Sequence, residues 1–313
     1  MHWKLKATIQ NTVSLLPSST SYALYYWLQR HLGGLRRINP VSELSKGIET
    51  WKLIKALKYE PLDKVFLEVG TGRIALVPLS YWLMGARKTI SIDLNPYLKG
   101  ELIKESIQYI SNHKNEIENL FGSLLDNKRW NTLLEFTKNA NFSTEAYLNL
   151  CQIDYIAPSN AANTGLAPHS IDFHTSSKVF EHIPLEILKQ IIKEGNRIIN
   201  KNGLFIHDID YSDHFSHSDT KISAINFLSY SDHEWERYAG NRYMYMNRLR
   251  HDDFLELFRH IGHNIVENIP KIDKRSQDLL KSGVLQLDER FKKKSEDILS
   301  ISGSWIVSNK SST

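Results

Sequence analysis

The pattern of hydrophobic and polar positions changes character after residue 60. Residues 1–60 have helical periodicity, broken at three points by proline, glycine and serine, which predicts a helical N-terminal extension or lid. Residues 64–69 (KVFLEV) and 89–94 (TISIDL) are short apolar runs rich in β-branched residues, so we expect two buried strands. The apolar residues 74–85 between them predict a helix that packs on the sheet.

The remaining chain repeats the alternation of strand and helix after one long interruption. Residues 98–149 are polar, follow a helical pattern and lack a strand signal, which predicts a helical insertion. Five further strands are expected, at residues 151–157, 171–176, 203–210, 264–269 and 302–308. Helical segments at residues 184–200 and 252–261 separate several of them. This alternation predicts a doubly wound α/β fold over residues 61–313, with a mostly parallel seven-stranded sheet and right-handed crossovers.

Composition narrows the class of protein and of partner. The 313 residues are 41% hydrophobic, as in ordinary globular proteins, and the net charge of +4 is spread along the chain, so nucleic acid is not an expected partner. The single cysteine, Cys151, cannot form an internal disulfide, and no secretory signal opens the chain, so we expect a cytoplasmic protein. Residues 15–35 are too polar to span a bilayer. The N-terminal extension could still contact a membrane surface or form a homodimer interface, and the sequence leaves both alternatives open.

A glycine turn after the first strand carries the strongest chemical signal. Residues 68–72 read EVGTG, and Asp93 ends the neighbouring strand. Gly70 and Gly72 allow a sharp turn and a close approach of the backbone to a ligand at the start of a helix. Asp93 is placed to accept hydrogen bonds from the two hydroxyls of a ribose. This arrangement suits any cofactor that contains adenosine.

Glu68 discriminates between such cofactors. Gly70, Gly72 and Ala75 also satisfy the dinucleotide fingerprint, which keeps a nicotinamide-dependent oxidoreductase as an alternative. A carboxylate at the mouth of the turn repels a pyrophosphate and attracts the ammonium of a methionine moiety. The cofactor is therefore expected to carry positive charge.

The chain resembles the Rossmann-like class I S-adenosylmethionine-dependent methyltransferases over roughly residues 62–308, in particular bacterial enzymes that act on small molecules. Their first motif is an acid followed by glycines at alternate positions; the third glycine would fall at residue 74, which is Ile here. The resemblance implies S-adenosyl-L-methionine as cofactor, held by Glu68, Gly70, Thr71, Gly72, Asp93, Leu94, Asp154, Tyr155 and Ser176. The resemblance also implies that Asp154, at the end of the third strand, contacts the adenine. The alternative is that Asp154 only caps a loop.

A second part of the resemblance concerns the turn after the fourth strand. Glu181-His182-Ile183 is similar to the acid-His-Ile sequence that borders the transferred methyl group in this family, which implies catalytic roles for Glu181 and His182. An imidazole of near-neutral pKa can take a proton from a hydroxyl or amine. The alternative is a histidine at a helix start that only bonds to the backbone.

Polar residues that follow the fifth strand predict an acceptor lid over residues 211–250. The expected acceptor-binding residues are His207, Asp210, His214 and Arg248. A guanidinium such as that of Arg248 can clamp a carboxylate or phosphate; surface ion pairs with Asp252 and Asp253 are the alternative. The spacing His214-x-x-His217 also suits a divalent cation, but solvated loop polarity explains it more simply, so no metal is assigned.

Together these features predict a methyltransferase that acts on an O or N atom of a small molecule, such as a natural product or glycan precursor. Two alternatives stay open: an NAD(P)-dependent oxidoreductase, and a non-catalytic binding protein with a methyltransferase-like fold.

Overall fold

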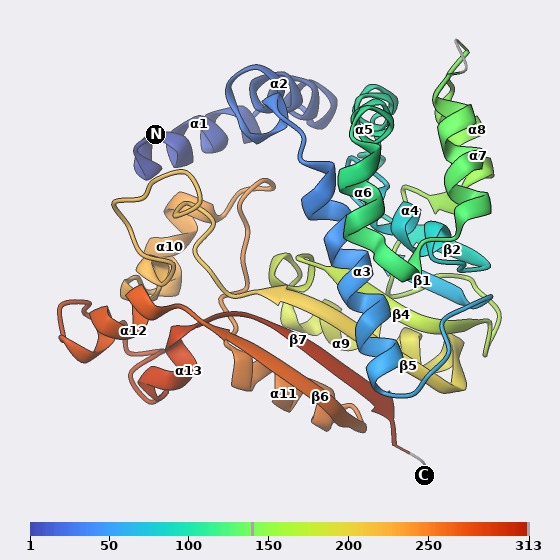
Figure 1. Cartoon of the computed structure of the whole chain (residues 1–313). Helices are drawn as coiled ribbons and strands as arrows, with labels where there is room; N and C mark the ends of the chain where they lie inside the picture. The colour runs from blue at the N-terminus through green and yellow to red at the C-terminus, as the bar shows by residue number, and fades with distance from the viewer. Residues whose placement is uncertain (139–140, 312–313) are drawn as a thin grey trace.

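A seven-stranded sheet forms the centre of the computed structural model, which describes residues 1–138 and 141–311 (Figure 1). The strands are β1 (Val65–Val69), β2 (Lys88–Ile92), β3 (Ile153–Ile156), β4 (Ile171–Ser177), β5 (Ile199–Asp210), β6 (His263–Ile272) and β7 (Ile301–Lys310). Their order is β3-β2-β1-β4-β5-β7-β6; β1 to β5 are parallel, and β7 is antiparallel to both of its neighbours. The predicted doubly wound, mostly parallel sheet is confirmed.

Helices cover both faces of the sheet (Figure 1). One face carries α3 (Pro40–Ala56), α4 (Leu76–Leu83) and α5 (Gly100–Asn112), and the other carries α9 (Leu185–Ile198) and α11 (His251–His260). In α3, Leu44, Ile48 and Trp51 recur at helical spacing and are buried against the sheet, so α3 belongs to this covering layer. In α9, Leu188, Ile191 and Ile192 do the same on the opposite face.

The insertion between β2 and β3 is helical, as predicted. After α5 it contains α6 (Lys114–Phe121), η2 (Gly122–Leu124), α7 (Asn127–Thr137) and α8 (Thr144–Leu150). Trp130, Leu133 and Tyr147 are buried on the α3 face of the sheet. The hydroxyl of Tyr147 donates to the backbone oxygen of Ala75 at 2.8 Å, so the insertion supports the segment that follows the glycine turn.

The N-terminal helices pack on the segment after β5 (Figure 1). This part contains α1 (Trp3–Ser14), α2 (Ser18–Leu32), η1 (Gly34–Arg36), η4 (Asn226–Ser229), α10 (Asp232–Ala239), α12 (Lys274–Lys281) and α13 (Glu296–Ser300). Trp3 of α1 is 4% exposed, and its ring lies 5.4 Å from Phe215 and 4.8 Å from Tyr238. Residues 211–250 thus share one apolar cluster with α1. In the described parts of the chain, every helix is too short or too polar to cross a membrane.

Candidate functional site

The chain reverses its winding direction between β1 and β4, and the carboxyl ends of these strands lie side by side. Glu68 of β1 pairs in register with Ser91 of β2 and Thr175 of β4. Open α/β sheets bind ligands in the crevice at this reversal point, because loops of opposite direction leave it uncovered. The glycine turn, Asp93 and the turn after β4 all start from this edge.

The glycine turn has the backbone geometry that the sequence predicts. Gly70 and Gly72 have φ angles of 81° and 73°, in the left-handed region that favours glycine. A methyl group on Gly70 would lie 2.5 Å from Val179, whereas one on Gly72 would meet no atom of the described residues within 4 Å, so the space above Gly72 is open to a ligand. The hydroxyls of Thr71 and Ser91 share a hydrogen bond that ties the turn to β2. Ile74, in place of a third glycine, packs on the core.

Glu68 is a buried carboxylate with spare hydrogen-bonding capacity. Its side chain is 2% exposed, and burial raises its pKa to about 7. One oxygen, Oε2, accepts from the hydroxyl of Tyr81 at 3.3 Å and from the hydroxyl of Thr175. Across residues 1–138 and 141–311, no donor is bonded to Oε1. A ligand with a positive charge would stabilise the carboxylate here.

Asp93 lies beside the glycine turn. Its Oδ2 accepts from the backbone N of Gly72 at 3.0 Å, and the nearby Tyr155 hydroxyl donates to the backbone oxygen of Asn95 at 3.5 Å. Burial raises the pKa of Asp93 to about 6. Leu94 follows it and is 71% exposed, so an apolar surface stands next to the acid. The structure therefore brings Gly72, Asp93, Leu94 and Tyr155 together.

Helix α2 covers this end of the turn. A cavity of about 220 Å³ lies between α2 and the segments that follow Gly72 and Asp93. It is lined by Ser19, Tyr22, Ala23, Tyr26, Arg73, Asn95, Pro96, Tyr97 and Lys99. The Arg73 guanidinium lies 5.1 Å from the centre of the Tyr26 ring. Burial lowers the pKa of Arg73. Sequence reasoning missed these residues, because only the fold places α2 over the turn.

The expectations for Asp154 and Ser176 are corrected by the structure. Asp154 lies in the middle of β3, opposite Ile90, and forms an exposed ion pair with Lys88. It does not reach the carboxyl edge, where an adenine would lie. Ser176 shares a hydrogen bond of 2.8 Å with Nδ1 of His207, on the side of the sheet covered by α9 and α11.

The expectation that His207 binds the acceptor is also corrected by the structure. Its side chain is fully buried, with its ring 4.2 Å from Phe180 and 5.7 Å from Phe258 of α11. Burial lowers its pKa well below the usual value, which keeps the imidazole neutral. His207 therefore belongs to the core behind the sheet rather than to an acceptor site.

Arg248 is held entirely by the protein. Its NH1 donates to the backbone oxygens of Phe227 and Tyr230 at 2.8 and 2.6 Å, and its NH2 pairs with Asp232. The side chain of Arg248 is 2% exposed. The expectation that Arg248 contacts an acceptor is thus corrected. The alternative, a surface ion pair with Asp252 or Asp253, is corrected as well. Arg248 instead fixes the segment that precedes α11.

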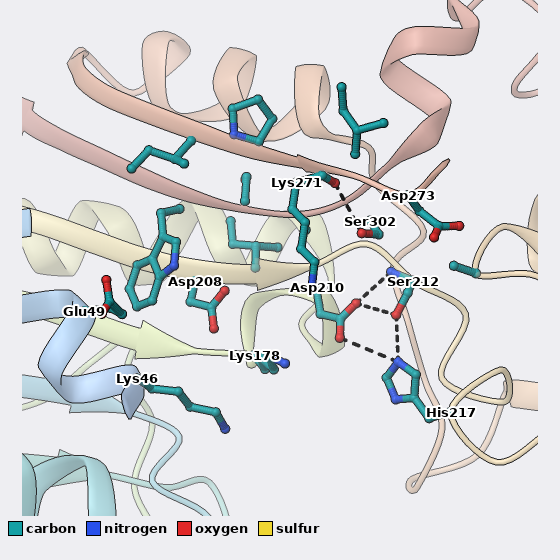
Figure 2. Close-up of a pocket in the computed structure, with 18 of the residues that line it drawn as sticks. Lys46, Glu49, Lys178, Asp208, Asp210, Ser212, His217, Lys271, Asp273 and Ser302 are labelled. Atoms are coloured by element: carbon teal, nitrogen blue, oxygen red, sulfur yellow. Dashed lines mark hydrogen bonds and ion pairs between the residues drawn. The ribbon is translucent and has the colours of Figure 1, made fainter. Parts of the chain in front are cut away.

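A cavity of about 640 Å³ lies between α3, the end of β5 and the β6–β7 pair. Figure 2 shows Lys46 of α3 on one side of it and Lys271 on another, with Asp208 and Asp210 between them. Asp210 is 8% exposed and accepts from the backbone N of Ser212 at 2.8 Å. Both signs of charge line this space, so it suits a polar small molecule.

Sequence reasoning missed the contribution of α3 to this cavity. Ser42, Ser45, Lys46 and Glu49 line it and recur at helical spacing. This polar stripe opposite the buried face of α3 was the available signal. Lys178, which follows β4, was missed as well.

Glu181 and His182 lie in η3 (Phe180–His182), directly after β4 and beside Asp210 and His214. Nδ1 of His182 is 2.8 Å from the backbone oxygen of Tyr245, and its ring centre is 4.8 Å from that of His214. Burial, and next the neighbouring His214, lower the pKa of His182 to about 4, so the imidazole is neutral at physiological pH. Burial raises the pKa of Glu181 well above its usual range. The structure thus brings together four residues predicted for catalysis and acceptor binding.

Comparison with known proteins gives structural matches only. No family model matches the sequence, and no curated protein matches it. Magnesium protoporphyrin IX methyltransferase from Synechocystis, crystallised with bound SAH, is 10% identical, with a TM-score of 0.47 over 98% of this chain and 99% of that one. An S-adenosylmethionine-dependent methyltransferase from Clostridium acetobutylicum is 11% identical, with a TM-score of 0.45 over 93% and 99%. Geranyl diphosphate C-methyltransferase from Streptomyces coelicolor is 9% identical, with a TM-score of 0.46 over 85% and 79%.

Proposed function

We propose that this protein is an S-adenosylmethionine-dependent methyltransferase that acts on an O or N atom of a small polar molecule. The observation that carries the proposal is the pairing of Asp93 with the open Gly72 turn, next to the buried, partly unsatisfied carboxylate of Glu68. A ribose diol suits Asp93, and a methionine ammonium suits Glu68. A nicotinamide dinucleotide would set its pyrophosphate against Glu68.

The chain's own residues supply binding and exclusion of water. When bound, the donor contributes an electrophilic methyl group on a sulfonium. Glu68 and Asp93 hold its two ends, and α2 with Tyr26 and Arg73 closes over the turn. Alignment of the nucleophile with the methyl group then accounts for most of the rate enhancement that such a site can provide.

The cavity between α3 and β5 would hold the acceptor. Its polar lining, with Lys46, Lys178 and Asp210, supports a substrate with hydroxyl, amine or acidic groups. His182, whose Nδ1 bonds to a backbone oxygen, keeps the lone pair of Nε2 available. As a base, His182 would take the proton of the attacking hydroxyl or amine, and Glu181 would support it; both roles stay predictions.

A labelling experiment tests the activity. The protein would be incubated with donor that carries a labelled methyl group and with a small-molecule extract. We expect label in the small-molecule fraction with the wild type and with Asp154→Ala, a matched acidic control outside the site, but not with Glu68→Gln or Asp93→Ala. Donor that binds but is never consumed with any extract would favour the non-catalytic alternative.

A further inference from the structure

Glu181 is the most unusual charged group of the described structure. Its side chain is 2% exposed, and neither Oε1 nor Oε2 has a hydrogen-bond partner in the parts of the chain that the structure describes. Its backbone carbonyl oxygen accepts from the backbone N of Asn247 at 2.9 Å. A buried carboxylate is costly unless a proton or a cation neutralises it. The groups that surround Glu181 include candidates for holding such a cation.

Two histidines offer ligand atoms to this carboxylate. One atom each from Glu181, His182 and His214 lie within 4.8 Å of one another. Donor atoms around a cation with bonds of about 2.1 Å are about 3 to 3.5 Å apart. Small side-chain rotations would close the remaining gap, because the rings of His182 and His214 already contact each other edge to face, with centres 4.8 Å apart.

Both imidazoles have nitrogen atoms free for a ligand. Nδ1 of His182 is 2.8 Å from the backbone oxygen of Tyr245, so it carries the proton and Nε2 keeps its lone pair. A bond from the second nitrogen to a carbonyl is the usual support of a metal-bound histidine. Nε2 of His214 is buried and has no hydrogen bond in the described residues; it faces Asp210 at 3.6 Å.

A second cluster shares His214 but is already satisfied. Ligand atoms of Asp210, His214 and His217 also lie within 4.8 Å of one another. Asp210 accepts from the backbone and hydroxyl of Ser212, and Nε2 of His217 is 2.9 Å from the same hydroxyl (Figure 2). These groups already have hydrogen-bond partners, whereas the two carboxyl oxygens of Glu181 have none among the described residues.

We propose that Glu181, His182 and His214 bind one divalent transition-metal ion, with Asp210 next to it on the acceptor side. Two imidazoles and one carboxylate favour Zn²⁺, Mn²⁺, Fe²⁺ or Co²⁺ over Mg²⁺ and Ca²⁺, and they leave coordination positions open. If the proposed methyltransferase activity holds, a hydroxyl of the acceptor bound at an open position would lose its proton more readily. His182 would then act as a ligand of the ion and not as a base.

Metal binding can be measured without any methyl transfer. Chelator-treated protein would be titrated with Co²⁺, followed by visible absorption, and with Zn²⁺ by calorimetry; Mg²⁺ would serve as the control ion. We expect one Co²⁺ per chain, and a loss of affinity of more than about 10-fold, the least that loss of even a supporting group costs, in Glu181→Gln and His214→Ala. His217→Ala, a matched histidine control, should bind as the wild type does. Melting curves would show that each variant is folded, and His182→Ala would replace any variant that is not.

Two outcomes would overturn the proposal. The first is no Co²⁺ or Zn²⁺ binding by the wild type, which would mean that Glu181 is simply protonated. The second is unchanged affinity in Glu181→Gln with loss in His217→Ala, which would move the ion to the other cluster. Titration of the chelator-treated protein with S-adenosylhomocysteine tests the donor site separately, so that the two proposals can fail independently.

Discussion

Proton release on donor binding should report directly on Glu68. Burial raises the pKa of this carboxyl to about 7, so about half of the unliganded molecules carry a proton on it at pH 7. A bound ammonium favours the carboxylate, and binding therefore expels that proton. The sign follows from the raised pKa: the charged form that binds the donor is lost as the pH falls through 7.

The magnitude can be worked out from the pKa values. At pH 7, Glu68 releases about 0.5 proton, while the free amino-acid ammonium of the ligand is already almost fully protonated, so the net release is roughly 0.5. Affinity should fall about tenfold between pH 8 and pH 6 from Glu68 alone, as its charged fraction falls from about 0.9 to about 0.1. Asp93, with a pKa of about 6, adds to the loss at the acidic end.

Calorimetry in buffers of different ionisation enthalpy measures this proton count. Titration with S-adenosylhomocysteine at pH 7 should give net release for the wild type and a value near zero for Glu68→Gln. Asp154→Ala should match the wild type, because its carboxylate is paired with Lys88 on the surface. Equal release by the wild type and Glu68→Gln would refute the assignment of Glu68 to the ammonium.

Three further predictions follow from the same contacts. Glu68→Gln should stabilise the unliganded protein at pH 8 by up to about 4 kcal/mol, because a buried carboxyl with a raised pKa opposes folding above its unfolded pKa of ~4.3. Equal denaturation midpoints at pH 8 would contradict this. Gly72→Ala should weaken donor binding and cost about 1 to 2 kcal/mol of stability, since its φ is 73°, as calorimetry and urea unfolding would show. Arg250→Ala should destabilise the fold by about 3 kcal/mol or more, because its guanidinium donates to the backbone oxygens of Tyr211, Leu299 and Ile301; a melting temperature unchanged from the wild type would refute this.

Local features of the site could be predicted from the sequence. Short-range rules predict β1, which ends at Val69, and the glycine turn that follows it directly. They also predict the next strand along the chain, which Asp93 follows. The helical insertion and the order of strands and helices were predictable for the same reason.

The face of the sheet to which a side chain points, and contacts between residues distant in sequence, could not be predicted in this way. Successive side chains of a strand point to opposite faces, so an error of one residue in register moved Ser176 and His207 from the site to the core. Asp154 does not reach the carboxyl edge, because it is only the second residue of β3. Arg248 pairs with Asp232 only because residues 211–250 pack together in the fold, and no local sequence pattern predicts this ion pair.

The most direct test of the central proposal is a calorimetric titration of the purified protein with S-adenosylmethionine, with NAD⁺ titrated in parallel. We predict binding of S-adenosylmethionine that Asp154→Ala keeps and that the double variant Glu68→Gln, Asp93→Ala loses, with no binding of NAD⁺. Binding of NAD⁺ with none of S-adenosylmethionine would contradict the account and restore the oxidoreductase alternative.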